Sequence, residues 1–228
     1  MQRRIIRKLE LETFLSKVKA HPSPKPSLEQ YTIPSDVAAT ILHIAAYTYD
    51  DLIGKTVLDL GCGTGRLAIG AAYLGAQHVV GVDIDKKAIK TAIKNSSMFN
   101  LKEKIEWATA DLDAVHGKFD TVLQNPPFGV QKRGADRKFL IKALQVGKKI
   151  YSLHKSLHKE KSFMEKLKKV KVMPVSPSPF IRRLTKENGG EIKATYAMLM
   201  KIPHMFPFHT KEKHEFIVEL YVINSESY

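Results

Sequence analysis

The chain has 228 residues, of which 43% are hydrophobic and 26% are charged, so it suits one large globular domain. Its 37 Lys and Arg residues against 23 Asp and Glu give a net charge of +14, which favours a polyanionic partner with a phosphate backbone, although a lysine-rich solvated surface is the simpler explanation. A single cysteine excludes an intramolecular disulfide, and the chain has no Cys/His cluster with metal-site spacing. It also has no signal-peptide core and no run of membrane-spanning length. We therefore expect a cytoplasmic protein without a metal ion or a membrane contact.

Helical periodicity and prolines organise the start of the chain. Apolar residues spaced as on one helix face predict a helix over residues 2–19, and three prolines within residues 21–26 predict an extended connector. A second helix is expected after Pro34, with Ser35 as its N-cap. We therefore predict an N-terminal helix and Pro-rich connector over residues 1–27, followed by one domain over residues 28–228.

Strand and helix patterns alternate from Lys55 onward. Short apolar runs predict strands at 56–60, 78–82, 105–108, 119–123 and 149–153, and helical periodicity lies between them at 67–74, 86–95 and 137–146. This alternation predicts an α/β fold, with a mostly parallel sheet, helices on both faces and right-handed crossovers. Ligands of such a sheet bind at the carboxyl ends of its strands.

The last third of the chain has a different pattern. We expect strands at 169–175, 198–202 and 216–222. The segment 176–196 contains prolines, a Gly-Gly pair and the basic residues Arg182 and Arg183, and we interpret it as an exposed basic loop.

A glycine-rich loop follows the first predicted strand, in the sequence Asp59-Leu60-Gly61-Cys62-Gly63-Thr64-Gly65. Glycines allow the backbone to approach a ligand closely, and the next helix directs its N-terminal N–H groups into the same space. A dinucleotide site requires its third glycine at position 66, where this chain has Arg66. The spacing instead resembles motif I of the class I methyltransferases, in which this loop wraps the methionine half of S-adenosylmethionine.

Acidic residues follow the next two predicted strands. Asp83 lies 22 residues after Gly61, at a position where a carboxylate can accept both ribose hydroxyls of a cofactor. Asp85 is better placed than Asp83 to cap the following helix. In class I methyltransferases an acid at the position of Asp111 hydrogen-bonds the adenine amine, although turns also favour aspartate. With their neighbours Ile84 and Leu112, these residues complete the expected cofactor site.

The most specific motif is Asn125-Pro126-Pro127-Phe128, directly after the fourth predicted strand. Two prolines cannot donate ladder hydrogen bonds and stiffen the turn. The Asn125 side-chain oxygen and the Pro126 carbonyl can both accept from one planar NH2 group, and Phe128 offers a face on which a base can stack. The motif therefore predicts methyl transfer to an exocyclic amine that is held in position, without a metal or a strictly required general base.

These motifs together resemble the small-subunit ribosomal RNA adenine-N6 methyltransferases of archaea and eukaryotes, the methyltransferase-like five family. The similarity runs from Leu28 to about His154, with a weaker match from Lys201 to Val222. It is carried by 28–31 (Leu-Glu-Gln-Tyr), 50–51, 59–65, 82–85, 120–122, 125–129 and 151–155 (Tyr-Ser-Leu-His-Lys). Generic methyltransferases lack the last of these stretches, whereas 176–196 looks like an insertion.

The resemblance implies a Rossmann-like fold with a seven-stranded sheet whose last strand is antiparallel, and it implies S-adenosylmethionine as the cofactor. Gln30 and its neighbours would fold over the cofactor, Gly61, Thr64, Asp83 and Asp111 would contact it, and residues 125–128 would be catalytic. The resemblance also implies an adenine in small-subunit ribosomal RNA as the substrate. A small zinc-binding activator protein that pairs with a sheet edge is the implied partner.

Basic residues near the catalytic motif are the candidate RNA contacts. Lys132, Arg133 and Arg137 follow the motif directly, and His154 and Lys155 follow the fifth predicted strand. His154 would touch an RNA phosphate or line the base pocket, unless it is a solvated loop histidine. We add Arg182 and Arg183 of the basic loop to this set.

Two other functions remain open from the sequence. A protein methyltransferase that modifies a glutamine amide also needs a planar nitrogen held by Asn-Pro-Pro, but its fourth residue is usually Tyr. A non-catalytic RNA-binding protein with the same fold would not need the intact set of cofactor and catalytic residues. Phe128 and the charge of +14 favour a nucleobase.

Overall fold

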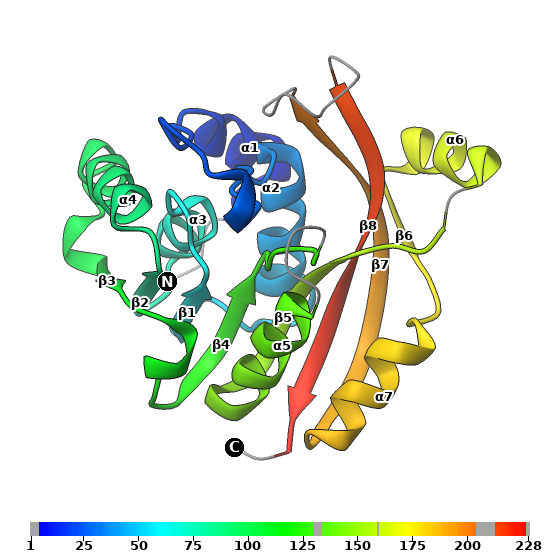
Figure 1. Ribbon diagram of the computed structural model, residues 1–228. Helices are drawn as coiled ribbons and strands as arrows, with labels where there is room; N and C mark the ends of the chain where they lie inside the picture. The colour runs from blue at the N-terminus through cyan, green and yellow to red at the C-terminus, as the bar shows by residue number, and fades with distance from the viewer. Residues whose placement is uncertain (1–4, 130–133, 159, 204–212, 227–228) are drawn as a thin grey trace.

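The computed structural model describes residues 5–129, 134–158, 160–203 and 213–226 (Figure 1). The strands are β1 (Thr56–Leu60), β2 (His78–Asp83), β3 (Ile105–Thr109), β4 (Phe119–Gln124), β5 (Gly147–Lys155), β6 (Val172–Pro174), β7 (Gly190–Pro203) and β8 (Lys213–Ser225). The longer helices are α1 (Lys8–Ser16), α2 (Ser35–His43), α3 (Arg66–Leu74), α4 (Lys86–Met98), α5 (Ala135–Val146), α6 (Lys161–Val170) and α7 (Pro179–Glu187). All five strands and three helices predicted for residues 56–153 are present, with ends that differ by a few residues.

One sheet contains all the described strands, in the order β3-β2-β1-β4-β5-β8-β7-β6. Strands β1 to β5 are parallel, and β8, the last strand of the chain, is antiparallel to β5. The antiparallel last strand is thus confirmed, but the expected count of seven strands is wrong because β6 adds an eighth strand along β7. The chain order reverses between β1 and β4, and such a reversal opens a crevice at the carboxyl ends of the two strands.

Helices cover both faces of the sheet (Figure 1). Helices α1, α2 and α3 pack on one face against residues such as Val57 and Leu123, and α5 and α7 pack on the other against Leu58 and Val122. Successive residues of β1 and β4 are therefore buried on opposite faces, as parallel strands require. This burial explains why the sequence of these strands is a short apolar run without strict alternation.

The N-terminal helix belongs to the same core as the rest of the chain. Leu11 and Leu15 are fully buried and join the cluster that contains Leu42 of α2. The boundary predicted between residues 27 and 28 therefore does not separate two cores. Ser35 is the first residue of α2 and makes no capping bond, so its predicted role as N-cap is wrong.

The segment 176–196 is not a loop, contrary to the prediction. It contains α7 and the first residues of β7. Ser178 caps α7 by accepting a hydrogen bond from the Ile181 N–H at 3.2 Å, Pro179 occupies the first turn, and Ile181 and Thr185 are buried four residues apart. A Ser-Pro start followed by this spacing is a helix signal that the count of basic residues obscured. The strand expected at 169–175 is likewise only β6, because α6 continues to Val170.

Among the residues that the structure describes, we find no helix with the length and apolar character needed to cross a membrane.

Candidate active site

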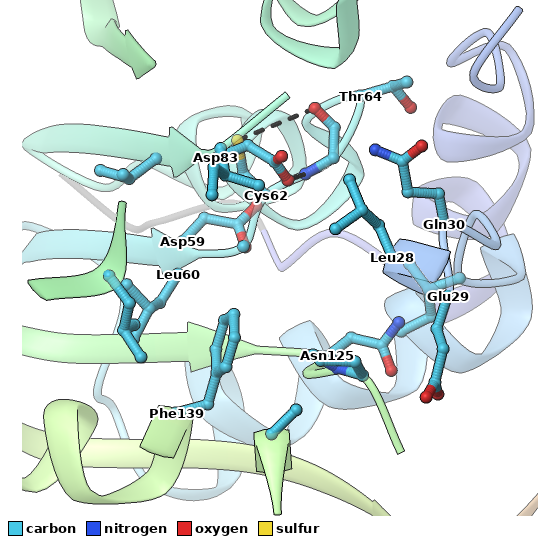
Figure 2. Close-up of a pocket in the computed structure, with 18 of the residues that line it drawn as sticks. Leu28, Glu29, Gln30, Asp59, Leu60, Cys62, Thr64, Asp83, Asn125 and Phe139 are labelled. Atoms are coloured by element: carbon cyan, nitrogen blue, oxygen red, sulfur yellow. Dashed lines mark hydrogen bonds between the residues drawn. The ribbon is translucent and has the colours of Figure 1, made fainter. Parts of the chain in front are cut away.

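A cavity of about 350 Å³ lies at the carboxyl ends of β1, β2 and β4 (Figure 2). This volume is within the usual range for a site that binds a small molecule. Every residue predicted for the cofactor lines it: Gln30, Asp59, Gly61, Cys62, Gly63, Thr64, Asp83, Ile84, Asp111, Leu112 and Asn125. The fold thus brings together residues that are spread over 96 positions of the sequence, from 30 to 125.

The glycine loop is shaped for a ligand that lies against its backbone. Gly61, Gly63 and Gly65 have φ angles of +74°, +54° and +86°, which favour glycine. An added Cβ at Gly61 would come within 2.8 Å of Phe139, whereas an added Cβ at Gly63 would meet nothing within 4 Å. Gly63 therefore leaves open space beside its backbone, and Gly61 is needed because Phe139 packs against it.

Arg66, which breaks the dinucleotide pattern, has a structural role. Its guanidinium donates hydrogen bonds to the carbonyls of Ile33 and, at 2.8 Å, of Val18. These two carbonyls lie at the two ends of residues 18–33, a segment that we call the connector, and residues 27–33 of the connector line the cavity. Burial lowers the pKa of Arg66 to about 10, so the side chain is charged at neutral pH.

The Asp83 carboxylate is oriented by two backbone donors. One oxygen accepts from the Gly63 N–H and the other from the Asp85 N–H, both at 2.8 Å. An ionised carboxylate has about four acceptor positions, so roughly two remain for ribose hydroxyls. Burial raises the pKa of Asp83, and these two bonds oppose the shift. Asp85 caps α4 through the Lys87 N–H at 2.8 Å, as predicted.

Asp59 and Cys62 lie deeper in the same wall. Asp59 is 1% exposed, accepts a hydrogen bond from the Ala68 N–H at 2.8 Å, and has a pKa that burial raises to about 7. Burial also raises the pKa of the Cys62 thiol well above its usual value. Cys62 is therefore a protonated, small lining residue, and Asp59 is ready to ionise beside a cation.

The position of Asp111 is compatible with both roles that the sequence allowed. Its side chain accepts a hydrogen bond from the Asp113 N–H at 3.0 Å, as a turn aspartate does. It also lines the cavity. One of its oxygens is therefore used by the turn, and the other remains available for a ligand.

The Asn-Pro-Pro-Phe turn lies at the end of β4, on the opposite wall from Asp83 (Figure 2). Asn125 and Pro127 line the cavity, and Pro126 is buried. The side-chain oxygen of Asn125 is buried and has no hydrogen-bond partner in the described part of the chain. Because buried polar atoms are nearly always paired, this oxygen is suited to accept from a ligand.

Phe128 is not open for stacking, contrary to the prediction. Its ring is stacked against Tyr31, with centroids 5.4 Å apart and planes at 29°, and Phe216 approaches it perpendicularly at 5.7 Å. Its backbone N–H donates to the Glu29 carboxylate at 2.7 Å. Sequence patterns do not predict these contacts, because the contacts join segments that lie far apart in the chain.

Known proteins share the fold and much of the sequence of this chain. The profile of the ribosomal protein L11 methyltransferase (PrmA) family matches residues 37–126. The uncharacterized protein MJ0284 of Methanocaldococcus jannaschii is 36% identical over 96% of this chain and 93% of its own. The rRNA N(6)-adenosine-methyltransferase METTL5 of Danio rerio is 40% identical over 64% of this chain and 73% of its own. This chain belongs to the METTL5 family.

Solved structures agree with this assignment. PH1948 of Pyrococcus horikoshii, an RNA methyltransferase candidate, matches with a TM-score of 0.81 and 34% identity over 97% of this chain and 99% of its own. A magnesium protoporphyrin IX methyltransferase of Synechocystis with bound S-adenosylhomocysteine shares the fold at a TM-score of 0.60 and 19% identity, over 83% of this chain and 82% of its own. The predicted family and the class I methyltransferase fold are therefore confirmed.

Four of the residues predicted to contact RNA in this METTL5-family chain are exposed in the structure. Arg137 is exposed, with its guanidinium 4.5 Å from the centre of the Phe180 ring, and Lys155 is exposed, with its amine 5.6 Å from the centre of the Phe216 ring. Arg182 and Arg183 are exposed on α7. Lys132 and Arg133 lie outside the described residues.

The prediction for His154 is wrong. The residue lies within β5, is 4% exposed, and its ring nitrogen is 2.7 Å from the Ser152 hydroxyl. Its ring also packs edge-on against Tyr221. Burial lowers its pKa to about 4, so it is neutral and cannot attract a phosphate.

The sequence missed two kinds of site residue. His21 and Phe139 line the cavity, and Glu29 and Tyr31 contact the Asn-Pro-Pro-Phe turn. Glu29 and Tyr31 lie in the Leu-Glu-Gln-Tyr stretch, which carried the family resemblance but no assigned role beyond the cofactor. His21 lies among prolines and has no local signal at all.

Proposed function

We propose that this protein transfers a methyl group from S-adenosylmethionine to the N6 amine of an adenosine in ribosomal RNA. Membership of the METTL5 family supports this reaction, since relatives from Danio rerio and Drosophila melanogaster that are each 40% identical carry that name. The observation that carries the proposal is the buried, unpartnered side-chain oxygen of Asn125 in the described structure, on the wall of the cavity that faces Asp83.

The residues of the cavity match the parts of the cofactor. Asp83 would accept the ribose hydroxyls with its remaining lone pairs, and Asp111 would accept the adenine amine. The glycine loop would lie along the methionine part, beside Asp59. When bound, the cofactor supplies an electrophilic methyl group on a positively charged sulfur.

The Asn-Pro-Pro-Phe turn, residues 125–128, which we call the catalytic turn, would hold the adenine that receives the methyl group. Asn125 and the Pro126 carbonyl would each accept one N–H of the target amine, which directs the lone pair of its nitrogen out of the base plane. Reaction then depends on in-line positioning of amine and methyl group, for which no metal is required. The adenine must be single-stranded or flipped out of its stack to reach this depth.

Two finer points extend the proposal: the RNA is that of the small subunit, and the active form contains a small zinc-binding activator protein. Such a partner would add a strand to a sheet edge. β3 and β6 are the edges of the described sheet, and β3 is the better candidate because β6 has only three residues and ends at Pro174, which has no N–H.

Radiolabelled methyl transfer tests the proposal. Purified protein, alone and with the activator, is incubated with labelled S-adenosylmethionine and either small-subunit ribosomal RNA, large-subunit ribosomal RNA or peptide release factors. We expect label in small-subunit RNA, recovered as N6-methyladenosine after digestion, and more of it with the activator. Label that enters only protein supports a glutamine methyltransferase and removes the proposal.

A further inference from the structure

The connector that crosses the cavity is fixed at both ends. Arg66 binds the carbonyls of Val18 and Ile33, and the Asn95 side chain exchanges two hydrogen bonds with the Lys19 backbone, at 3.1 and 3.2 Å. Because these anchors are backbone contacts, the connector keeps its course over the cavity whatever its side chains do.

Side chains in the middle of the connector reach both walls of the cavity. Gln30 donates to the Asp85 carboxylate at 2.9 Å on the cofactor side. Glu29 accepts from the Phe128 N–H at 2.7 Å on the side of the catalytic turn. Figure 2 shows Leu28, Glu29 and Gln30 together along one wall, with Gln30 at the Thr64 end and Glu29 at the Asn125 end.

Tyr31 occupies space that a target base would need. Its ring lies 5.4 Å from that of Phe128, centroid to centroid, at 29°, which is the geometry of an offset-stacked pair. No second flat ring fits between two rings at this separation. A base and Tyr31 therefore exclude one another on this face of Phe128.

Two further features indicate that this arrangement holds the site ready for a substrate. Glu29 has φ +50° and ψ +39°, a left-handed conformation that side-chain-bearing residues seldom adopt and that clusters at functional sites. The buried hydroxyl of Tyr31 lies beside the Asn125 side chain, whose buried oxygen lacks a hydrogen-bond partner in the described structure. The acceptor oxygen of the turn is thus unsatisfied while the stacking surface is covered.

We propose that Tyr31 and Glu29 hold the place of the target base at the catalytic turn, and that the base enters by displacing the Tyr31 ring from Phe128. Rotation of these two side chains exposes the turn, while Arg66 and Asn95 keep the connector over the cofactor. Tyr31 and Glu29 are thereby positioning residues that set how readily RNA engages. This inference rests on the proposed function, because it takes a nucleobase as the displacing group.

The apparent affinity for RNA decreases when fewer molecules are open to the base, and increases when more of them are open. Tyr31→Ala and Glu29→Gln should raise that fraction and lower the KM for RNA. For Tyr31→Ala we expect a decrease between about 2-fold and 12-fold, the range that corresponds to one aromatic pair. For Glu29→Gln we expect at least about a 2-fold decrease, since a neutral amide oxygen accepts more weakly than a carboxylate.

The experiment measures KM and kcat with an in vitro transcript of small-subunit ribosomal RNA, and the Kd for S-adenosylhomocysteine by calorimetry. Glu103→Gln, an exposed carboxylate just before the amino end of β3, is the matched control and should leave all three values unchanged. A KM that is unchanged or raised in both Tyr31→Ala and Glu29→Gln overturns the inference, since Tyr31 would then not compete with the base.

A readout without RNA completes the test. Amide hydrogen exchange at Phe128, followed in a peptide that covers the turn, should be faster in Glu29→Gln than in the wild type, and equal rates overturn the Glu29 contact. If the wild type methylates no RNA, the proposed function fails. If it methylates RNA but the variants do not lower KM, only this inference fails.

Discussion

The Gly63 N–H donates a hydrogen bond of 2.8 Å to the carboxylate of Asp83. This bond joins the acid at the end of β2 to the loop that follows β1, so the proposed ribose acceptor and the glycine loop form one wall of the cavity. The ligand-binding capacity of Asp83 therefore depends on the conformation of the loop, and the loop depends on Asp83.

Asp83→Ala should remove most of the cofactor affinity. The variant loses the acceptors for two ribose hydroxyls and leaves the Gly63 N–H without its partner. We expect a loss of about 3 kcal/mol or more, or about 100-fold in the Kd for S-adenosylhomocysteine, measured by calorimetry. Glu106→Gln, a carboxylate exposed on β3, is the control. A Kd within threefold of the wild type would show that Asp83 does not hold the ribose.

Asn125→Ala should affect the rate of methyl transfer most strongly. Loss of one preorganised acceptor at a reacting group typically lowers kcat by about 10²-fold to 10³-fold. The measurement is single-turnover methyl transfer to ribosomal RNA at saturating cofactor. Gln77→Ala, which removes an exposed amide next to the amino end of β2, is the control. Wild-type rates in Asn125→Ala would contradict the role of the catalytic turn.

Cofactor affinity should rise with pH up to about 7. Asp59 has a pKa of about 7 in the free protein because it is buried, and a positively charged ligand beside it favours its ionised form. Below that pH, binding must release the proton, which weakens affinity by up to about tenfold per pH unit. Calorimetry with S-adenosylmethionine between pH 5.5 and 8.5 tests this. Asp59→Asn should flatten the profile, and an equal slope in both proteins would contradict the assignment.

His154 should contribute to stability and not to RNA binding. His154→Ala removes a buried ring and its bond to Ser152, and we expect the free energy of unfolding to fall by about 2–4 kcal/mol. Because the folded pKa is about 4, below the unfolded value, the wild type loses stability as pH falls from 6.5 toward 4. Urea unfolding at pH 7 and pH 5 should therefore show a smaller difference between the two proteins at pH 5.

Lys155→Ala is the protein variant to compare with His154→Ala in RNA binding, because Lys155 is the exposed neighbour of His154. It should weaken RNA binding and reduce the salt slope by about 1. Fluorescence anisotropy with ribosomal RNA fragments would compare the two. Weaker RNA binding in a fully folded His154→Ala, without a change in Lys155→Ala, would reverse the assignment.

His21 should contribute a hydrogen bond to the cofactor. Its Nδ1 accepts from the Ser23 N–H at 3.1 Å, so in the neutral ring the proton lies on Nε2. Nε2 is buried 3.7 Å from the Asp85 carboxylate and has no partner within hydrogen-bond distance among the described residues, and His21 lines the cavity. His21→Ala should raise the Kd for S-adenosylhomocysteine by about 2-fold to 12-fold. His21→Gln, which keeps an N–H donor, should recover part of the loss. His78→Ala, which changes a half-buried histidine at the amino end of β2 that does not line the cavity, should have no effect. Equal affinity in all of these proteins would exclude the contact.

Local sequence determined the sheet and most of the cofactor site. The strands β1 to β4 are short apolar runs, and Asp59, Asp83, Asp111 and Asn125 come at or next to their ends. Parallel strands with right-handed crossovers place all their carboxyl ends along one edge, so these four side chains meet whatever the details of packing. For that reason both the cavity and its chemistry followed from motifs and periodicity.

Contacts between distant segments were decided by the tertiary structure alone. The bond from Phe128 to Glu29 spans 99 residues, and nothing in the sequence near either residue specifies it. The position of His154 after an apolar run predicts an accessible residue that contacts RNA or solvent, but β8 pairs alongside β5 and packs Tyr221 against the His154 ring. Periodicity records which residues are buried within one element, whereas the identity of the partner depends on how elements far apart in the chain pack together.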